Sequence, residues 1–240
     1  MFMPPELIHS NYRKNLDEPP TGASDEIKSS SFYLAPSGHL YQLHHRLITG
    51  SSLDGCVEVF EMVLFSGNEA YLVDHMLPSL EGKSKEDAIQ SLLDFQMHEK
   101  STNCIARVAY SKTNVATVNK SLLGAQIKGA FVDDEYSGDG IASFIYDWLL
   151  DSFGCVISDN QQTQEGAGLW AYKFSTKYDD LHVYDQTSKQ YYGALTSNLL
   201  KQTGESVWST NTLTAVDVAE EDYSVSFEDC HNKTVLFFIP

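Results

Sequence analysis

The stretch that decides the fold runs Gly124-Ala-Gln-Ile-Lys-Gly-Ala-Phe-Val132, Tyr136-Ser-Gly-Asp-Gly-Ile-Ala142 and, after a helical segment to Leu150, Gly154-Cys-Val-Ile-Ser158. This pattern predicts a strand, a glycine turn, an amphipathic helix over 138–151 and a second, short strand over 154–158. A glycine turn that feeds a helix leaves free backbone N–H groups at the positive end of the helix dipole, which suits a diphosphate. The stretch therefore predicts a site for a nucleotide-like acyl cofactor.

These residues resemble the acetyl-CoA-binding segment of the GNAT superfamily of N-acetyltransferases. The family pattern Arg/Gln-x-x-Gly-x-Gly/Ala falls on Ser137-x-x-Gly140-x-Ala142, with serine at the polar first position. A second block, Ser158-Asp159-x-x-x-Thr163-x-x-Gly166-x-x-Leu169-Trp170, is similar to a version of the fold found in bacteriophage and prophage proteins. The resemblance implies an α/β fold with a mixed, mainly antiparallel sheet flanked by helices.

The resemblance also implies a cofactor, acetyl-CoA or another acyl-CoA, and a set of site residues. The backbone around the turn would hold the diphosphate, while strand 123–132 would pair with the pantetheine. The implied cofactor-binding residues are Val132, Ser137, Gly138, Asp139, Gly140, Ile141 and Ala142.

Acyl transfer to an amine needs groups that take and give protons, and the resemblance assigns these steps to Ser158, Asp159 or Tyr172. The tyrosine usual in the family falls where Leu169-Trp170 stands here. Trp170 cannot donate usefully to a thiolate, so Tyr172 or Tyr178 would replace that tyrosine. Trp170 itself is expected to be a core anchor. Ser158 and Asp159 have a second interpretation, in which they satisfy N–H groups of a turn and a helix start.

Four acidic residues crowd the expected diphosphate site: Asp133, Asp134, Glu135 and Asp139. A carboxylate ~7 Å from a phosphate costs roughly 2 kcal/mol at an effective dielectric of about 20, comparable to the upper end of what a helix dipole supplies. The direction in which Asp139 points therefore decides how well an anion binds.

The composition is that of a folded protein, since 42% of the 240 residues are hydrophobic and 12% aromatic. No apolar run approaches the ~20 residues of a membrane span, and the first residues do not resemble a secretion signal. We expect a cytoplasmic protein, in the host cytoplasm if a phage encodes it. The four cysteines have no Cys-x-x-Cys spacing, and the histidines lack ligand spacing, so we expect reduced thiols, surface or strand histidines and no metal site.

The net charge of −17 bears on partners. The negative electric field of such a charge repels nucleic acid and favours binding of a cationic small molecule or a basic protein. Two interpretations of the charge stay open: it keeps the protein soluble, or it mimics DNA. The sequence leaves the oligomeric state open.

We expect three parts: a flexible N-terminal arm over 1–31, a GNAT-like acyltransferase domain over 32–186 and a β-rich C-terminal extension over 187–240. The alternation of apolar residues predicts strands over 39–48, 55–65, 103–110, 114–118, 123–132, 181–184, 223–227 and 234–239. Ser84-x-x-Asp87 resembles a capping box and predicts a helix over 85–98, and Thr163 is expected to cap a helix that runs through Phe174. The charge run Asp217 to Asp222 is expected to be a solvated loop.

Three functional hypotheses follow. The first is acyl-CoA-dependent transfer to an amine of a small molecule or a basic protein. The second is a catalytically inactive, GNAT-like acidic protein that occupies a basic, nucleic-acid-handling partner, for example to counter a host defence. A third, modification of nucleobases as in some phage relatives of the superfamily, is opposed by the charge.

Overall fold

A computed structural model of the chain describes residues 6–8, 16, 18–20, 22–24, 26–65, 71, 74–75, 77–96, 98–178, 181–196, 199–204 and 234–239. The chain divides into two compact units. Unit 1 comprises Met1–Asn15, Tyr110–Gly129 and Tyr146–Pro240, and unit 2 comprises Leu16–Ala109 and Ala130–Ile145. The predicted strand over 223–227 and the charge run Asp217 to Asp222 lie outside the described residues.

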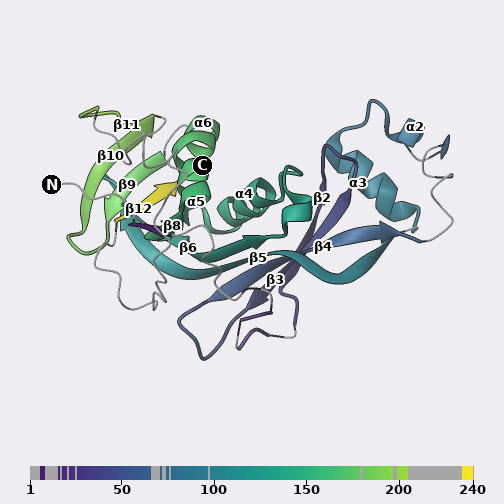
Figure 1. Ribbon diagram of the computed structural model, residues 1–240, viewed down its shortest axis with the longest axis horizontal. Helices are drawn as coiled ribbons and strands as arrows, with labels where there is room; N and C mark the ends of the chain where they lie inside the picture. Colours follow the sequence, from purple (N-terminus) through teal and green to yellow (C-terminus); the bar gives the residue numbers. More distant parts are fainter. Residues whose placement is uncertain are drawn as a thin grey trace. The chain divides into compact units, whose positions relative to one another are not determined.

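The strands form a ten-stranded sheet in the hydrogen-bonded order β11-β10-β9-β12-β7-β6-β5-β4-β3-β2 (Figure 1). The pairings β2–β3, β3–β4, β12–β7, β12–β9, β9–β10 and β10–β11 are antiparallel. Strand β7 (Val156–Ile157) runs parallel to β6 (Ser121–Val132). The expected α/β fold with a mixed, mainly antiparallel sheet is confirmed at this level.

Unit 2 begins with an antiparallel meander of β2 (Ser29–Leu34), β3 (Leu40–Leu47) and β4 (Gly55–Leu64). The strands expected over 39–48 and 55–65 are therefore confirmed, because their alternating apolar residues fit two faces of a sheet. His44 and His45 lie in β3 and are both buried, so of the two positions expected for the histidines, surface or strand, this pair takes the strand.

Helices α2 (Leu77–Leu80) and α3 (Lys85–Asp94) follow β4. The Ser84 hydroxyl accepts the N–H of Asp87 at 3.1 Å, which is the cap predicted from the sequence. A small core forms between α3 and the first strands, with Leu40 and Leu92 at its centre. The helix ends at Asp94, earlier than the expected residue 98.

The next strand is longer than the sequence predicted. Strand β5 (His98–Ala116) is continuous, whereas we expected two strands over 103–110 and 114–118 with a polar turn between them. Ser111 is buried within the strand. The polar residues 111–113 look like a turn in the sequence, but a strand inside a sheet accommodates polar side chains when a neighbouring strand supplies hydrogen-bond partners. Here the Thr113 hydroxyl donates to Gln126 Oε1 of β6 at 3.0 Å.

Helix α4 (Ile141–Phe153) follows β6 and precedes β7, as predicted. Ile141, Ile145 and Leu149 are buried, in keeping with one apolar stripe at helical spacing. After β7 come β8 (Gln161–Thr163), α5 (Gln164–Gly168), the wider helical turn η3 (Leu169–Phe174) and α6 (Ser175–Lys177).

The predicted helix start and core anchor in this segment are both present. Thr163 Oγ1 accepts the N–H of Gly166 at 3.1 Å, which confirms the predicted cap. Trp170 is buried and packs edge-on against Tyr146 with ring centroids 5.7 Å apart, so its role as a core anchor is confirmed.

The last described strand enters the middle of the sheet. Strand β12 (Thr234–Phe238) pairs with β7 on one side and with β9 (Leu181–Asp185) on the other, both antiparallel. Strands β10 (Gln190–Thr196) and β11 (Leu199–Leu200) continue the sheet beyond β9. The expected border between 186 and 187 thus falls in the turn of the β9–β10 hairpin, and the expected extension supplies three strands of the sheet.

The N-terminal segment, expected to be a flexible or loosely docked arm, makes contacts at several described points. Strand β1 (Glu6–Ile8) pairs in parallel with β8. The N–H of Ser24 donates to the Leu47 carbonyl at 2.8 Å, and Leu16 is buried. The described residues of this segment are thus docked, because their backbone groups find partners that the sequence does not reveal.

None of the helices in the described part of the chain has the length and apolar character needed to cross a bilayer.

Candidate anion site at the start of helix α4

The candidate site is the turn that joins β6 to α4 in unit 2. Strand β6 ends at Val132, a short helical turn η2 (Asp134–Tyr136) follows, and α4 begins at Ile141. Gly138 and Gly140 have φ angles of 98° and 82°. L side chains rarely adopt these angles, so both glycines are required by the backbone and the predicted glycine turn is present.

The first turn of α4 presents polar groups that have no partner among the described residues. The first backbone bond that closes on the turn runs from the N–H of Phe144 to the Gly140 carbonyl at 3.0 Å. The amides of Ile141, Ala142 and Ser143 precede it and receive no acceptor from the described chain. The Ser143 hydroxyl is buried and also lacks a partner. Three amides and one hydroxyl at a helix start are the donor set that an anionic oxygen prefers.

The acidic residues beside the turn are partly held by local hydrogen bonds. Asp133 Oδ1 accepts the N–H of Glu135 at 3.0 Å and so caps η2. Asp139 Oδ2 accepts the hydroxyl of Tyr41 in β3 and lies 3.6 Å from His39 Nδ1. The Asp139 carboxylate is therefore committed to β3, and this bond settles the direction that the sequence left open.

Aromatic side chains cover one side of the turn. The Tyr33 hydroxyl donates to the Asp139 carbonyl at 2.8 Å, and its ring stacks on Phe144 with centroids 4.7 Å apart. A Cβ added at Gly140 would lie 2.6 Å from the Tyr33 hydroxyl. The turn therefore approaches β2 so closely that glycine is needed for space as well as for backbone conformation.

A second tyrosine–carboxylate bond lies next to the first. Tyr136 donates to Glu61 Oε2 at 3.0 Å, and His39 Nδ1 lies 3.8 Å from Glu61 Oε1 and 3.2 Å from the Tyr41 hydroxyl. Burial and the neighbouring Asp139 raise the pKa of Tyr41 well above its usual range. Burial and the Glu61 carboxylate raise the pKa of Tyr136 to about 12. Both phenols thus act as neutral donors that fix the two carboxylates.

The expected proton-transfer residues lie in unit 1, whereas the turn lies in unit 2. Ser158 Oγ accepts the N–H of Leu236 at 2.9 Å and donates to the Asp159 carbonyl at 2.9 Å. The Asp159 side chain accepts the N–H of Asn160 at 2.9 Å. Ser158 and Asp159 thus satisfy backbone groups of strand β12 and of a turn. The turn belongs to the second interpretation, whereas the contact with β12 belongs to neither.

The two tyrosines proposed in place of the family's usual one have different surroundings. Tyr172 has 44% of its surface exposed. The Tyr178 hydroxyl donates to Asp147, and burial together with that carboxylate raises the pKa of Tyr178 above its usual range. Tyr178 is thereby engaged in a structural hydrogen bond.

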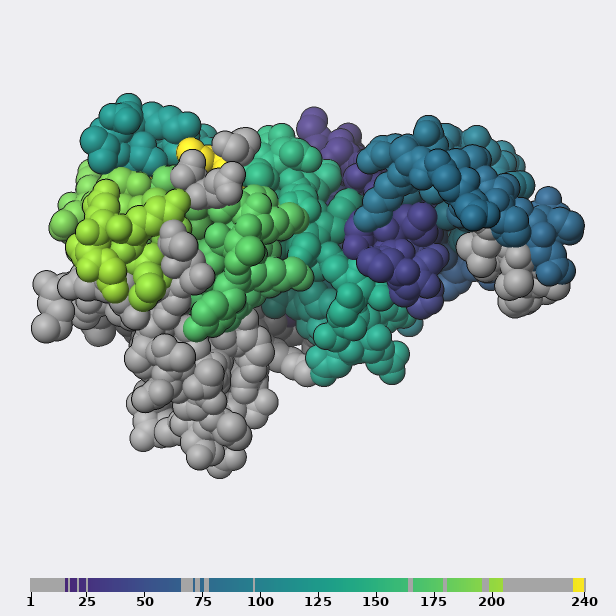
Figure 2. All heavy atoms as spheres, turned by 90° about the horizontal axis from the view of Figure 1, so that it is seen from above, coloured from purple at the N-terminus to yellow at the C-terminus, as the bar shows by residue number. Residues whose placement is uncertain are grey.

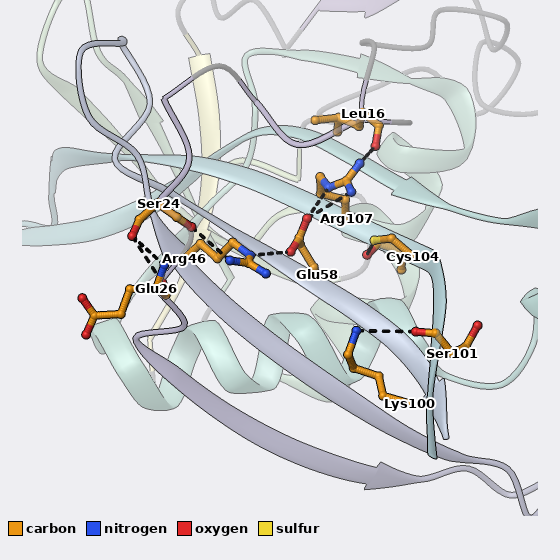
Figure 3. A network of polar contacts seen from close by, with 10 residues as sticks. Leu16, Ser24, Glu26, Arg46, Glu58, Lys100, Ser101, Cys104 and Arg107 are labelled. Carbon is orange, nitrogen blue, oxygen red and sulfur yellow. Dashed lines mark hydrogen bonds and ion pairs between the residues drawn. The ribbon is translucent and has the colours of Figure 1, made fainter. Parts of the chain in front are cut away.

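Unit 2 also contains a buried charge network, drawn in Figure 3. Glu58, with a side-chain exposure of 3%, accepts Arg46 Nε at 2.8 Å and Arg107 Nη2 at 3.0 Å. The same two arginines donate onward to backbone carbonyls, Arg46 to Ser24 and Arg107 to Leu16. The network joins the stretch that holds Leu16 and Ser24 to strands β3, β4 and β5, and the buried carboxylate shared by two guanidinium groups has its lone pairs satisfied.

No group of three or more histidine, cysteine or carboxylate side chains within the described ranges could hold a metal ion. Cys56, Cys104 and Cys155 are free thiols, and burial raises the pKa of Cys56 and of Cys155 to about 12. Such thiols are poor nucleophiles at neutral pH, as expected for core residues.

Sequence reasoning found the turn but missed several residues around it. Ser143 could have been named from the sequence, because it occupies the third position of a helix that was predicted over 138–151 and begins at Ile141. Tyr33, Tyr41 and Glu61 carry no local signal, because their roles arise from strands that meet the turn only in the folded chain.

Comparison of the chain with known protein families, with curated proteins and with solved structures gives no match.

Proposed function

We propose that this protein is an acyl-CoA-dependent N-acyltransferase whose cofactor diphosphate binds at the start of α4. The observation that carries the proposal is the set of polar groups without described partners there: the amides of Ile141, Ala142 and Ser143 and the buried Ser143 hydroxyl. A buried donor without an acceptor costs about 1–3 kcal/mol, and a bound phosphate oxygen would remove that cost.

The order of elements supports the same proposal. Strand β6, a glycine turn, helix α4 and the parallel strand β7 follow one another in the order expected for a GNAT-like fold. Strand β7 pairs with β6 only at Ala125 and Gln126, so the pairing stops well before β6 ends at Val132. This arrangement is compatible with the expected role of β6 beside the pantetheine.

The residues around the turn fit an anionic group in some respects and oppose it in others. The Asp139 carboxylate is held toward β3 by Tyr41, and the implied set from Val132 to Ala142 would hold the cofactor through its backbone. The carboxylates of Asp133, Asp134 and Glu135 beside the same turn oppose an anion. When bound, the cofactor would supply an activated thioester. The chain's own part is to hold the diphosphate and to attract the acceptor, for which a net charge of −17 favours a cationic amine.

A second candidate function is a catalytically inactive, acidic binding protein on the same scaffold. Two observations favour it. The Ser158 hydroxyl accepts the N–H of Leu236 in β12, and Tyr33 covers one side of the turn. In that case the protein would occupy a basic partner through its charge, and the start of α4 would bind no cofactor.

Calorimetric titration with acetyl-CoA separates the two candidates. We expect saturable binding to the wild-type chain and a loss of at least about tenfold in affinity in Ser143→Asp, because a carboxylate in the first turn stabilises the helix but repels a phosphate. Ser143→Ala should bind about two- to fivefold more weakly, since it removes one donor only.

Ser152→Asp is the matched control, because it adds the same charge to an exposed position in the last turn of α4. Its affinity should stay near that of the wild type. Absence of binding to the wild-type chain would exclude the transferase and leave the binding protein. Binding without release of free CoA in the presence of spermidine, lysine or a lysine-rich peptide would exclude catalysis on those amines.

A further inference from the structure

Two arginines of the buried charge network hold a short piece of chain on unit 2. This piece, called here the docked segment, consists of residues 16, 18–20 and 22–24. Arg107 donates to its Leu16 carbonyl. Arg46 Nη1 donates to its Ser24 carbonyl at 3.0 Å. Both guanidinium groups also bind Glu58, and Figure 3 shows them reaching from this carboxylate to the two carbonyls. The position of the docked segment therefore depends in part on one carboxylate.

The docked segment lies at the surface and is joined to the end of β3 by backbone bonds. The N–H of Ser24 donates to the Leu47 carbonyl at 2.8 Å. The N–H of Thr49 donates to the Gly22 carbonyl at 3.0 Å. Residues 18–19 are exposed, and Figure 2 shows purple atoms of the early described chain at the surface, next to blue atoms of later residues. Surface segments of this kind open locally while the core of a unit stays folded.

A buried histidine faces the shared carboxylate. His44 in β3 is directly opposite Glu58 in β4, so the two side chains lie on the same face of the sheet. The exposed fraction of His44 is 4%, and its Nδ1 atom is buried without a hydrogen-bond partner among the described residues. Phe60 packs against the imidazole with ring centroids 5.2 Å apart, and Ser30, opposite His44 in β2, is uncharged. A proton added to this ring would therefore be a buried charge across from the Glu58 carboxylate.

The other charged groups around His44 are cations. Arg46 lies two residues further along β3, on the same face. The Lys100 ammonium of β5 lies 3.7 Å from the centroid of the Phe60 ring. Burial, and after it the charges of Lys100 and Arg46, lower the pKa of His44, whereas Glu58 acts in the opposite direction. His44 is therefore uncharged at neutral pH while the segment is docked.

We propose that protonation of His44 releases the docked segment, so that this part of unit 2 is a pH-sensitive switch. A protonated His44 is a third cation beside the carboxylate that Arg46 and Arg107 already share. Any contact that Glu58 makes with the imidazolium is lost to one of the guanidinium groups, which then no longer holds its backbone carbonyl in place. Detachment also lets water reach the imidazolium and removes the cost of a buried charge. The switch is independent of the acyl-CoA site, because none of these residues belongs to the turn before α4.

The lowered pKa fixes the direction of the pH dependence. The docked form binds the proton less tightly than the released form, in which the imidazole has its ordinary pKa of 6.5. Docking is therefore strongest above about pH 7.5 and weakens as the pH falls through 6.5. One histidine shifts this equilibrium by at most about tenfold at about pH 5.5.

Hydrogen exchange of the full chain, followed by NMR at about pH 5.5 and 7.5, tests the proposal. The measured quantity is the protection factor of the Ser24 amide, which corrects for the intrinsic effect of pH on exchange. We expect it to be about three- to tenfold lower at the acidic pH in the wild type. In His44→Gln, which keeps a polar side chain without a titrating group, it should change less than about twofold. His75→Gln removes an exposed histidine, is the matched control and should behave like the wild type.

A second amide shows whether the segment opens by itself. The N–H of Asp133 donates to the Ile105 carbonyl at 2.8 Å and reports on the unfolding of unit 2. Its protection factor should exceed that of Ser24 at both pH values. Equal protection of the two amides would mean that the segment detaches only when unit 2 unfolds, and would overturn the proposal.

The wild type alone supplies a further test, which does not depend on the folding of any variant. The ring-proton resonances of His44 should titrate with a midpoint below 6.5, and the Ser24 protection factor should fall over the same pH range. A midpoint at or above 6.5, or a Ser24 protection factor that does not change with pH, would overturn the proposal. An equal acid-induced loss of protection in a folded His44→Gln variant, checked by circular dichroism, would overturn it too.

Discussion

The Tyr33 hydroxyl in β2 donates to the backbone carbonyl of Asp139 at 2.8 Å, across 106 residues of sequence. A Cβ added at Gly140 would lie 2.6 Å from the same hydroxyl, which is too close for a side chain. This contact links the edge strand of unit 2 to the turn that precedes α4, so the conformation of the turn depends on β2 as well as on its own glycines.

Removing this hydroxyl should weaken the turn without disturbing its packing. Tyr33→Phe keeps the ring that stacks on Phe144 but loses the bond to Asp139, so we expect the free energy of unfolding to fall by about 1 kcal/mol. Urea denaturation measures the change. Tyr172→Phe is the control, because Tyr172 is exposed and its hydroxyl makes no described hydrogen bond. Equal stability of Tyr33→Phe and the wild type would mean that the bond adds nothing to the fold.

Substitution of Glu58 should lower the stability of unit 2 more than most other single substitutions. Glu58→Gln leaves Arg107, whose side chain is 3% exposed, without its counter-charge, so we expect a loss of about 3–5 kcal/mol in the free energy of unfolding. Glu135→Gln makes the same chemical change at an exposed position and should cost less than about 0.5 kcal/mol. Similar midpoints of chemical denaturation for the two variants would contradict the structural importance of the network.

Two identical glycine substitutions should have opposite effects. A Cβ at Gly124 would lie 2.8 Å from the Cys155 carbonyl oxygen, where β6 and the strand after α4 approach closely, so Gly124→Ala should destabilise the protein by about 1–3 kcal/mol. Gly168 has helical φ and ψ angles of −62° and −41°, and a Cβ there would meet nothing within 4 Å. Gly168→Ala should therefore stabilise the protein by about 0.4–1 kcal/mol. Thermal unfolding of both variants checks the sign, and a stabilising Gly124→Ala would show that the two strands are not in close contact.

Stability should decline in alkaline solution because several tyrosines are harder to ionise in the fold. Tyr136 has a pKa of about 12 in the folded chain and an ordinary value of 10.0 in the unfolded chain. A raised pKa in the fold gives a stabilising contribution that is complete below pH 10 and is lost as the pH rises from 10 to about 12. In Tyr136→Phe this part of the decline should be absent. Urea unfolding at pH 9 to 11.5 gives the slope of stability against pH, and ultraviolet absorbance at 295 nm follows tyrosinate formation. Identical slopes for the wild type and Tyr136→Phe would contradict the bond to Glu61.

Several elements could be predicted because their signals are local. The alternation of apolar residues over 39–48 and 55–65 predicted strands β3 and β4. Ser84 predicted the start of helix α3, and the glycines of the turn predicted that a helix, α4, follows them. The single strand β5 was missed because its polar middle resembles a turn, and only its neighbour β6 supplies the partner that keeps Thr113 in a strand.

The candidate site was predictable to a smaller extent. The backbone donors at the start of α4 follow from the turn, but the direction of Asp139 required β3, which brings Tyr41 to it. The structure does not arrange Ser158 as a free proton-transfer group, because its hydroxyl receives an N–H from β12 near the other end of the chain.

The amino-acid sequence determined the succession of strand, glycine turn, helix and parallel strand, since turn chemistry, helix capping and apolar periodicity act over a few neighbouring residues. Tertiary structure alone decided that β12 enters the sheet between β7 and β9, that Tyr33 covers the turn and that Arg46 and Arg107 share Glu58. Each of these depends on groups far apart in the chain, whose burial and hydrogen bonding become favourable only when the strands between them have assembled.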